Sequence, residues 1–210
     1  MPKNTFHKLS ELKKQQLLKA AYQEFALNSL DSASITLLVK KLGIAKGSIY
    51  QYFENKEDMY LYLLEYAEHR KIDIYKRSFK SVYVDLEQAF VGLNLIGLKF
   101  DLNFPDYSLF LLGAYHEQHV IKGKSISLQQ ISKGIELYKS LLLQHKLPVH
   151  GYIPVLFFQI SHGLFNQVIS AFNLDVVSAI KSQMPVQGIS DTQLIEFVTD
   201  ISSCLFNEIT

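Results

Sequence analysis

The chain has 210 residues, of which 48% are hydrophobic and 20% are charged. This composition supplies ample apolar surface for a sizeable core and excludes an intrinsically disordered chain. Cys204 is the single cysteine, so an intramolecular disulfide is excluded too. The first ten residues are polar and basic, and no stretch approaches the roughly 18 uncharged apolar residues of a membrane span. We therefore expect a cytoplasmic protein that makes no membrane contact.

The small net charge of +1 is unevenly distributed along the chain. Residues 1–56 hold nine lysines and four acidic residues, a net charge of +5, whereas residues 57–210 have a net charge of −4. The basic N-terminal quarter is therefore where we expect contact with nucleic-acid phosphates.

Apolar residues recur at helical spacing along almost the whole chain, which predicts an all-α fold. A first helix is expected from Ser10, an N-cap, to Leu27, and Asn28 can end it in the left-handed conformation. A second helix follows Ser34 and stops at Gly43, which marks a tight turn. A third, short helix is expected over residues 46–52.

The second and third helices, with the glycine turn between them, form a helix-turn-helix. A helix enters the major groove of DNA only if its outer face is narrow and polar and its inner face is held rigidly. Gly47 permits close approach, while Ser48 and Gln51 can hydrogen-bond to bases or phosphates. Ala45 is expected to face inward, and the supporting apolar nucleus is expected to comprise Ile35, Leu38, Val39, Leu42, Ile44, Ile49 and Phe53.

Asn55 is expected to cap a long fourth helix. Further helices are expected at about 85–100, 105–120, 128–145, 152–173 and 191–208, separated by Pro, Gly, Ser and Asn. Pro105 suits a first helical turn, and Ser190 with Gln193 forms a capping box for the last helix.

A resemblance to the tetracycline-repressor (TetR) family is carried by the run Leu42-Gly43-Ile44-Ala45-Lys46-Gly47-Ser48-Ile49-Tyr50-Gln51-Tyr52-Phe53, followed by Asn55-Lys56-Glu57. The match covers roughly residues 10–64. It implies a three-helix helix-turn-helix domain at 1–55 and a helical ligand-binding and dimerisation domain at 56–210. It also implies a non-enzymatic, cofactor-free regulator, a repressor that binds a pseudo-palindromic double-stranded DNA operator as a homodimer. A small, mostly hydrophobic ligand is expected to release it.

The resemblance also implies DNA-contacting residues. Those at or near base edges are Thr36, Lys46, Gly47 and Ser48, with Gln51 on the same exposed face; those gripping phosphates are Ser34, Tyr50, Tyr52 and Lys56. Two alternatives stay open: the two tyrosines as partly core aromatics, and the lysine as a solvated surface charge. Ala45 stands where the family usually has a Ser or Thr N-cap, and Ser29 stands where it usually has Gly.

The C-terminal region offers candidate ligand residues. The aromatic residues can line an apolar cavity or form plain core: Phe104, Tyr107, Phe110 and Tyr115. Gln159, His162, Asn166 and Ser170 draw a polar seam along an otherwise apolar helix, which is either a pocket wall or a solvent-facing or interface strip. In the family the last two long helices form the dimer, and here the last carries a heptad-like stripe of Leu194, Val198, Ile201 and Leu205.

His116 and His119 lie three residues apart beside Glu117, but no further cluster completes a ligand set, so no metal site is expected. Cys204 is expected to be buried packing. An enzyme is disfavoured because the sequence has no nucleophile elbow, phosphate-binding glycine loop or carboxylate pair with a partner His. An architectural DNA-binding protein without an effector is disfavoured by the acidic C-terminal region, and an operator competition assay separates these classes.

Overall fold

The computed structural model describes residues 2–79, 83–117, 119–147 and 149–207, and these are helical nearly throughout. This confirms the all-α prediction. The helices are α1 (Asn4–His7), α2 (Glu11–Leu27), α3 (Ile35–Leu42), α4 (Lys46–Tyr52), α5 (Lys56–Ser78), α6 (Leu86–Asn103), α7 (Pro105–His116), α8 (Ile126–Gln144), α9 (Ile153–Ala171), α10 (Val176–Ser182) and α11 (Asp191–Asn207). Two short antiparallel strands, β1 (Val120–Ile121) and β2 (Lys124–Ser125), form a hairpin.

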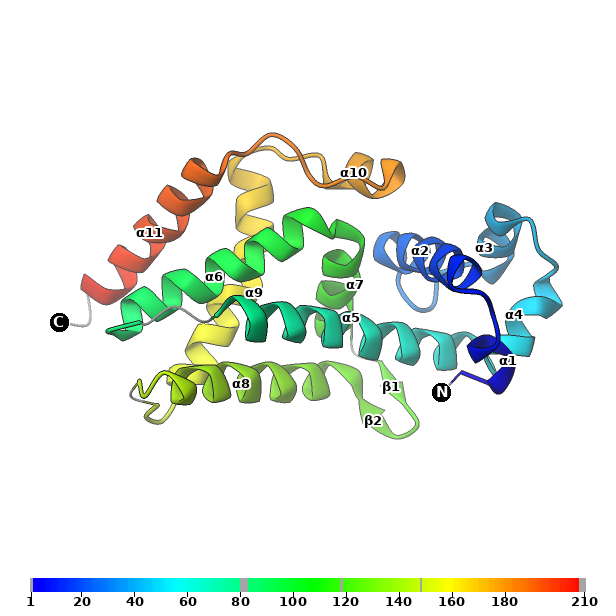
Figure 1. Cartoon of the computed structure of the whole chain (residues 1–210), viewed down its shortest axis with the longest axis horizontal. Helices are drawn as coiled ribbons and strands as arrows, with labels where there is room; N and C mark the ends of the chain where they lie inside the picture. Colours follow the sequence, from blue (N-terminus) through cyan, green and yellow to red (C-terminus); the bar gives the residue numbers. More distant parts are fainter. Residues whose placement is uncertain (1, 80–82, 118, 148, 208–210) are drawn as a thin grey trace. The chain divides into compact units, whose positions relative to one another are not determined.

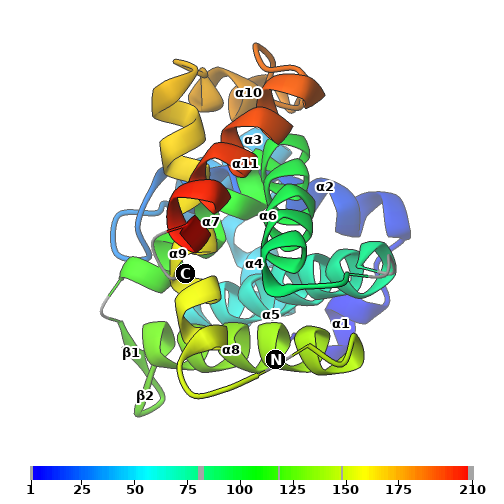
Figure 2. The same cartoon turned by 90° about the vertical axis from the view of Figure 1, so that its left-hand side faces the viewer.

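The described residues form two compact units. Unit 1 comprises the described residues of 2–69 and 106–127, and unit 2 comprises those of 70–105 and 128–207. In unit 1, α3 contacts both α2 and α4, and α1 contacts α4; these are the blue and cyan helices of Figure 1. In unit 2, α11 runs beside α6, as both Figure 1 and Figure 2 show.

Polar caps define the helices of unit 1 as the sequence predicts. Ser10 Oγ accepts a hydrogen bond from the Lys13 amide, and Asn55 Oδ1 accepts one of 2.7 Å from the Asp58 amide at the start of α5. One prediction here is wrong: Asn28 has φ −138° and ψ 139°, so its backbone is extended and not left-handed. Its side-chain Nδ2 instead donates to the Glu24 carbonyl at 3.0 Å, which satisfies a carbonyl at the end of α2.

An aromatic cluster from three helices fills the core of unit 1. Phe110 of α7 is 1% exposed and lies 4.9 Å from the Tyr60 ring of α5 and 5.6 Å from the Tyr22 ring of α2, between ring centroids. The Tyr107 ring stacks on Tyr22 at 4.1 Å. The Tyr22 hydroxyl donates a 2.6 Å hydrogen bond to the Leu63 carbonyl, so its one polar atom is satisfied. These contacts fix α7 against α2 and α5.

The core of unit 2 is built by α6, α9 and α11. The Phe90 ring of α6 meets Phe157 of α9 at 5.1 Å and Phe206 of α11 at 6.0 Å. Leu194 and Val198 of α11 are 2% and 0% exposed. Because α11 packs on α6, these two residues of the predicted dimer stripe are already covered within the chain. Cys204 is exposed, which corrects the expectation that it is buried.

The sequence did not predict three elements of the structure, namely α1, α10 and the hairpin. The turn of the hairpin holds Lys122 and Gly123 at φ 52° and 74°. One helix is also shorter than expected. The helix expected to reach residue 120 ends at His116, because the chain enters this hairpin at Val120.

No single helix among the described residues is both long and apolar enough to cross a membrane. Helices α9 and α10 pass that test only as a pair, and the chain bends by 96° between them.

Several tyrosines are expected to resist ionisation until the protein unfolds. Burial raises the pKa of Tyr22, and Tyr107 raises it further; burial and Tyr138 do the same for Tyr75, whose hydroxyl lies 3.1 Å from that of Tyr138. Their folded-state pKa values lie above the unfolded value of about 10. Their stabilising contribution is therefore complete below about pH 10 and is lost as the pH rises towards the folded-state values.

Phenolate ultraviolet absorbance measured with circular dichroism tests this, since the chain has twelve tyrosines and no tryptophan. We expect a first group to titrate in the native state and a second group to appear only as the helical signal is lost. Ionisation of all twelve with an unchanged helical signal would contradict the burial argument.

Candidate nucleic-acid interface

A tight left-handed turn joins α3 to α4. Gly43 has φ 66° and ψ 29°, a conformation that glycine adopts without steric cost. Its amide donates to the Lys40 carbonyl, and the Ile44 amide donates to the Val39 carbonyl at 3.1 Å. This pair of bonds is a Schellman cap, so α3 ends sharply and the chain is redirected into α4.

Helix α4 has one buried face and one exposed face. Ile49 is 1% exposed, and Phe53, directly after the helix, is also 1% exposed. On the other side Lys46, Gly47 and Gln51 are exposed and Tyr50 is 40% exposed, while Ser48 and Tyr52 are half-buried. A Cβ atom added at Gly47 would meet nothing within 4 Å. The outer face is therefore narrow at its N-terminal end and open to an approaching molecule.

The supporting nucleus is smaller than the sequence predicts. Five of the seven expected apolar residues are buried, namely Ile35, Leu38, Val39, Ile49 and Phe53. Leu42 is half-buried, and Ile44 is 36% exposed. Ala45 is exposed as well, because it is the N-cap of α4 and lies outside the helix face that packs inward. It provides no side-chain cap, as expected from its missing hydroxyl.

Ser34 and Thr36 lie at the start of α3. The Ser34 hydroxyl accepts a 3.2 Å hydrogen bond from the Leu37 amide, and its own amide donates to Glu24 Oε1 at 2.7 Å. Ser34 therefore caps α3 and ties it to α2, while the Thr36 side chain is exposed. The start of a helix carries the positive end of its dipole, which favours anionic groups such as phosphate.

The Lys56 side chain hydrogen-bonds to the loop between α2 and α3. Its Nζ donates to the Asp31 carbonyl at 2.9 Å and to the Ala33 carbonyl at 3.1 Å. Two of its three N–H donors are thus committed to the fold, which differs from the simple solvated charge considered from sequence. A substitution here would change the loop and any phosphate contact together, so Lys46 is the better residue with which to test DNA binding.

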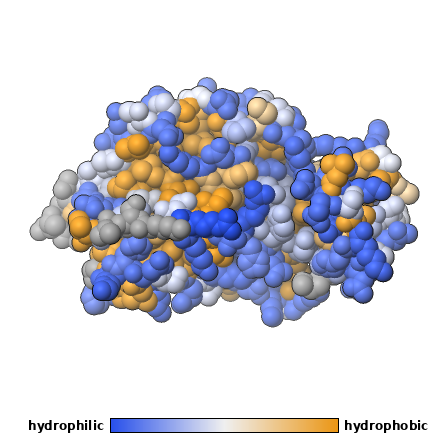
Figure 3. Space-filling model, in the orientation of Figure 1, coloured by the Kyte–Doolittle hydropathy of each residue, from blue (hydrophilic) through white to orange (hydrophobic). Residues whose placement is uncertain are grey.

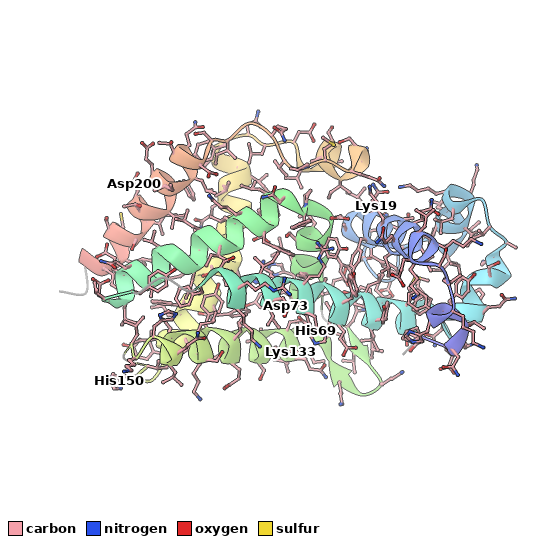
Figure 4. All side chains as sticks on the ribbon, viewed as in Figure 1. Lys19, His69, Asp73, Lys133, His150 and Asp200 are labelled. Carbon is pink, nitrogen blue, oxygen red and sulfur yellow. The ribbon has the colours of Figure 1, made fainter. Side chains whose placement is uncertain are left out.

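Several lysines give this part of unit 1 its positive charge. Lys40 and Lys46 are exposed at the end of α3 and the start of α4. Lys19, labelled in Figure 4, is an exposed residue of α2. Lys41 is held by the side-chain oxygen of Gln23. Positive charge on the surface next to an exposed helix is the electrostatic pattern expected of a duplex-binding protein.

The N-terminal segment contributes to α4, which the sequence did not reveal. Lys3 and Thr5 hydrogen-bond to carbonyls at the end of α4, and the Phe6 side chain is 1% exposed. The only sequence signal was a lone aromatic residue within a polar, basic segment.

The predicted ligand residues are distributed over both units. Phe110 lies in the core of unit 1, with Tyr107 packed beside it, and the half-buried Tyr115 ring is 5.1 Å from that of His116. Phe104 lies in unit 2, where the Arg70 guanidinium is 4.8 Å from its ring centroid. On α9, Gln159 and Asn166 are exposed and His162 is half-buried against the Phe158 ring. The arrangement of Phe110 and Tyr107 is that of core packing.

An apolar cavity of about 310 Å³ lies in unit 2. It is lined by Leu86, Phe90, His150, Gly151, Tyr152, Ile153, Leu156, Phe157, Ile160, Leu205 and Phe206, which include none of the seven predicted ligand residues. His150 and Tyr152 are exposed, and Figure 4 shows His150 at the end of unit 2 where α9 begins. Figure 3 shows hydrophobic residues at the surface over the part of unit 2 where Figure 1 draws α6 and α9.

The Glu117 carboxylate, directly after α7, interacts with one histidine and one tyrosine. His119 Nε2 lies 3.0 Å from Glu117 Oε2, and the Tyr60 hydroxyl donates to the same carboxylate oxygen at 3.4 Å. In the described ranges, no three His, Cys, Asp or Glu side chains gather in a way that would hold a metal ion.

Comparisons with known proteins agree with this geometry. Residues 17–63 match the sequence model of bacterial regulatory proteins of the tetR family. YerO, an uncharacterized HTH-type transcriptional regulator of Bacillus subtilis (strain 168), is 24% identical over a 209-residue alignment that covers 89% of this chain and 69% of YerO.

Two solved structures share the fold. A TetR family transcriptional regulator from Chloroflexus aurantiacus has a TM-score of 0.79 at 23% identity, covering 98% of this chain and 96% of that chain. The transcriptional regulator FadR from Bacillus subtilis, solved in complex with stearoyl-CoA, has a TM-score of 0.61 at 14% identity, covering 88% of this chain and 97% of that chain.

Proposed function

We propose, because this chain belongs to the tetR family of bacterial regulatory proteins, that it is a cytoplasmic repressor which places α4 in the major groove of an operator. The observation that carries the proposal is the exposed face of α4, where Lys46, Gly47 and Gln51 stand clear of the fold while Ile49 holds the helix from behind. The domain division at residue 55 and the contacts of Ser34, Thr36, Ser48, Tyr50, Tyr52 and Lys56 with DNA are part of this proposal.

A homodimer would present two such helices to a pseudo-palindromic operator. Helices α9 and α11 remain the proposed dimer elements. Since Leu194 and Val198 are already buried within the chain, the surface proposed for a second copy includes the face of α9 that carries the exposed Gln159 and Asn166 and the half-buried Gly163. A Cβ atom at Gly163 would meet nothing within 4 Å, so this face allows close approach of another helix.

In vitro selection of duplexes, followed by salt titration of the recovered sequence, tests DNA binding. We expect Lys46→Met to weaken binding and to reduce the slope of log affinity against log salt by about one, because one positive charge beside the duplex is lost and one fewer counterion is released on binding. Lys181→Met in α10 removes the same charge from unit 2 and serves as the control.

Equal effects of the two substitutions would remove α4 from the interface. Binding without sequence preference would favour an architectural DNA-binding protein, and no useful affinity for any duplex at low salt would return an enzyme to consideration.

The effector is proposed to be mostly hydrophobic, and the cavity of unit 2 supports this. Its wall is formed by phenylalanine, leucine and isoleucine side chains, with His150 and Tyr152 as polar-tipped residues. Such a cavity suits an apolar chain whose polar end stays in solvent. FadR from Bacillus subtilis, which shares the fold, was solved with stearoyl-CoA, so this acyl thioester is a suitable first probe.

Stearoyl-CoA is expected to release the selected duplex from the wild-type protein. Leu156→Trp partly fills the cavity and adds the chain's first tryptophan, so it should weaken the response and report on the site by fluorescence. His162→Ala tests the earlier ligand assignment on the same helix. Release that is weakened by His162→Ala but not by Leu156→Trp would place the effector at the polar seam of α9. An unchanged duplex complex would exclude this acyl ligand.

A further inference from the structure

The C-terminal end of α4 is completed by a segment that precedes the helix-turn-helix. An α-helix leaves its last four carbonyls without partners inside the helix. In α4 these are the carbonyls of residues 49–52. The Ile49 carbonyl accepts the Phe53 amide at 2.9 Å, which leaves three carbonyls at the exposed end of the helix.

Residues 3–7, here called the N-terminal arm, satisfy these three carbonyls. Lys3 donates twice, from its amide to the Tyr52 carbonyl and from Nζ to the Tyr50 carbonyl, both at 2.8 Å. The Thr5 hydroxyl donates to the Gln51 carbonyl. The Lys3 ammonium also lies at the negative end of the helix dipole, where a cation is favoured.

A buried aromatic side chain anchors the arm. The Phe6 ring centroid lies 5.2 Å from those of Phe53 and Tyr62 and 6.4 Å from that of Tyr52. Helix α1 and helix α4 are in contact. In the free protein, the arm is therefore packed both against the end of α4 and against α5.

Helix α4 depends on this support because its other end is weak. It has seven residues, and Ala45 gives it no side-chain cap. A helix this short is marginal by itself, since nucleation is unfavourable and few hydrogen bonds compensate. Tyr50 and Gln51, both assigned to the DNA-facing surface, belong to the last turn, whose carbonyls the arm holds.

We propose that the N-terminal arm positions the DNA-reading helix by capping its C-terminal carbonyls. Lys3 and Thr5 are positioning residues, and Phe6 is their anchor. The inference rests on the proposed function for its effect on DNA, but the cap itself is a property of the free protein.

Amide hydrogen exchange of the free protein tests the cap. Thr5→Val removes the hydroxyl donor with little change in shape or charge, and Thr5→Ser restores it. We expect the Phe53 amide and the amides of α4 to exchange about fivefold faster in Thr5→Val, near the effect of one lost hydrogen bond, and near the wild-type rate in Thr5→Ser. Amides of α9 in unit 2 should not change.

Binding to the selected duplex and to a random duplex of equal length tests the positioning role. Thr5→Val should reduce the affinity for the selected duplex about fivefold and the affinity for the random duplex less, with an unchanged salt slope because no charge is lost. Lys3→Met should lower the ratio of the two affinities, whereas Lys8→Met, which removes a neighbouring exposed charge, should leave the ratio unchanged.

The outcomes separate the two proposals. Unchanged exchange in both Thr5→Val and Lys3→Met overturns the cap, whatever the DNA result. Faster exchange with an unchanged affinity ratio overturns the positioning role. If the wild-type protein binds no duplex, the proposed function fails while the exchange result still decides the cap.

Discussion

Gly47→Glu is expected to abolish operator binding while the protein stays folded. The position is exposed, and an added Cβ meets nothing within 4 Å, so the fold tolerates a side chain. In the proposed complex the same side chain would place bulk and negative charge against DNA. Opposed like charges cost several kcal/mol, so the affinity should fall by about 100-fold or more. Fluorescence anisotropy with a labelled duplex and thermal unfolding measure the two properties.

Gly47→Ala separates crowding from charge. Alanine relieves the conformational cost of glycine in a helix, so stability should rise by about 0.5–1 kcal/mol while operator affinity falls. Gln144→Glu, at the exposed end of α8, adds the same negative charge in unit 2 and controls for net charge. A folded Gly47→Glu protein that binds the selected duplex normally would show that α4 does not approach DNA closely.

Phe110→Ala is expected to destabilise the protein by about 3–5 kcal/mol, the usual cost of emptying a buried phenylalanine site. Phe110 is 1% exposed and contacts Tyr22, Phe25 and Tyr60, so the surrounding rings cannot close the space without moving α2, α5 or α7. The midpoint of urea unfolding, followed by circular dichroism, measures the loss.

Phe104→Ala is the matched control, because Phe104 was assigned to the same predicted ligand set. It is half-buried at the end of α6, so its truncation should cost less than that of Phe110. A small stability loss in Phe110→Ala, joined to a changed response to the effector, would show that Phe110 lines a ligand site and is not simply core.

The helices were predictable where local signals and periodic apolar residues agree. Helix α4 has the predicted bounds, and the caps of Ser10 and Asn55 are present as expected. The Ser190–Gln193 capping box is also confirmed, with the Gln193 amide donating to Ser190 Oγ at 3.2 Å and Gln193 Oε1 accepting from the Ser190 amide at 3.0 Å. Each of these signals lies within four residues of the helix end it specifies, so sequence alone contains it.

The missing features depend on partners that are distant in sequence. Helix α1 has four residues, too few for periodicity to reveal, and the hydrogen bonds of Lys3 and Thr5 join it to residues 46 or more positions away. The bonds of Lys56 to Asp31 and Ala33 are of the same kind. Helical spacing predicts that one face of α4 is exposed. It does not predict the hydrogen bonds from Lys3 and Thr5 that hold the C-terminal end of α4.

The contribution of α7 to the core of unit 1 has a consequence for folding during synthesis. A nascent chain that has reached only residue 55 contains α2, α3 and α4, but Tyr22 and Phe25 then lack the Phe110 ring that covers them. At about 5–20 residues per second, the ribosome needs several more seconds to deliver α7. Until then the rings of Tyr22 and Phe25 stay accessible to chaperones, and the core of unit 1 is completed only after half of the polypeptide has been made.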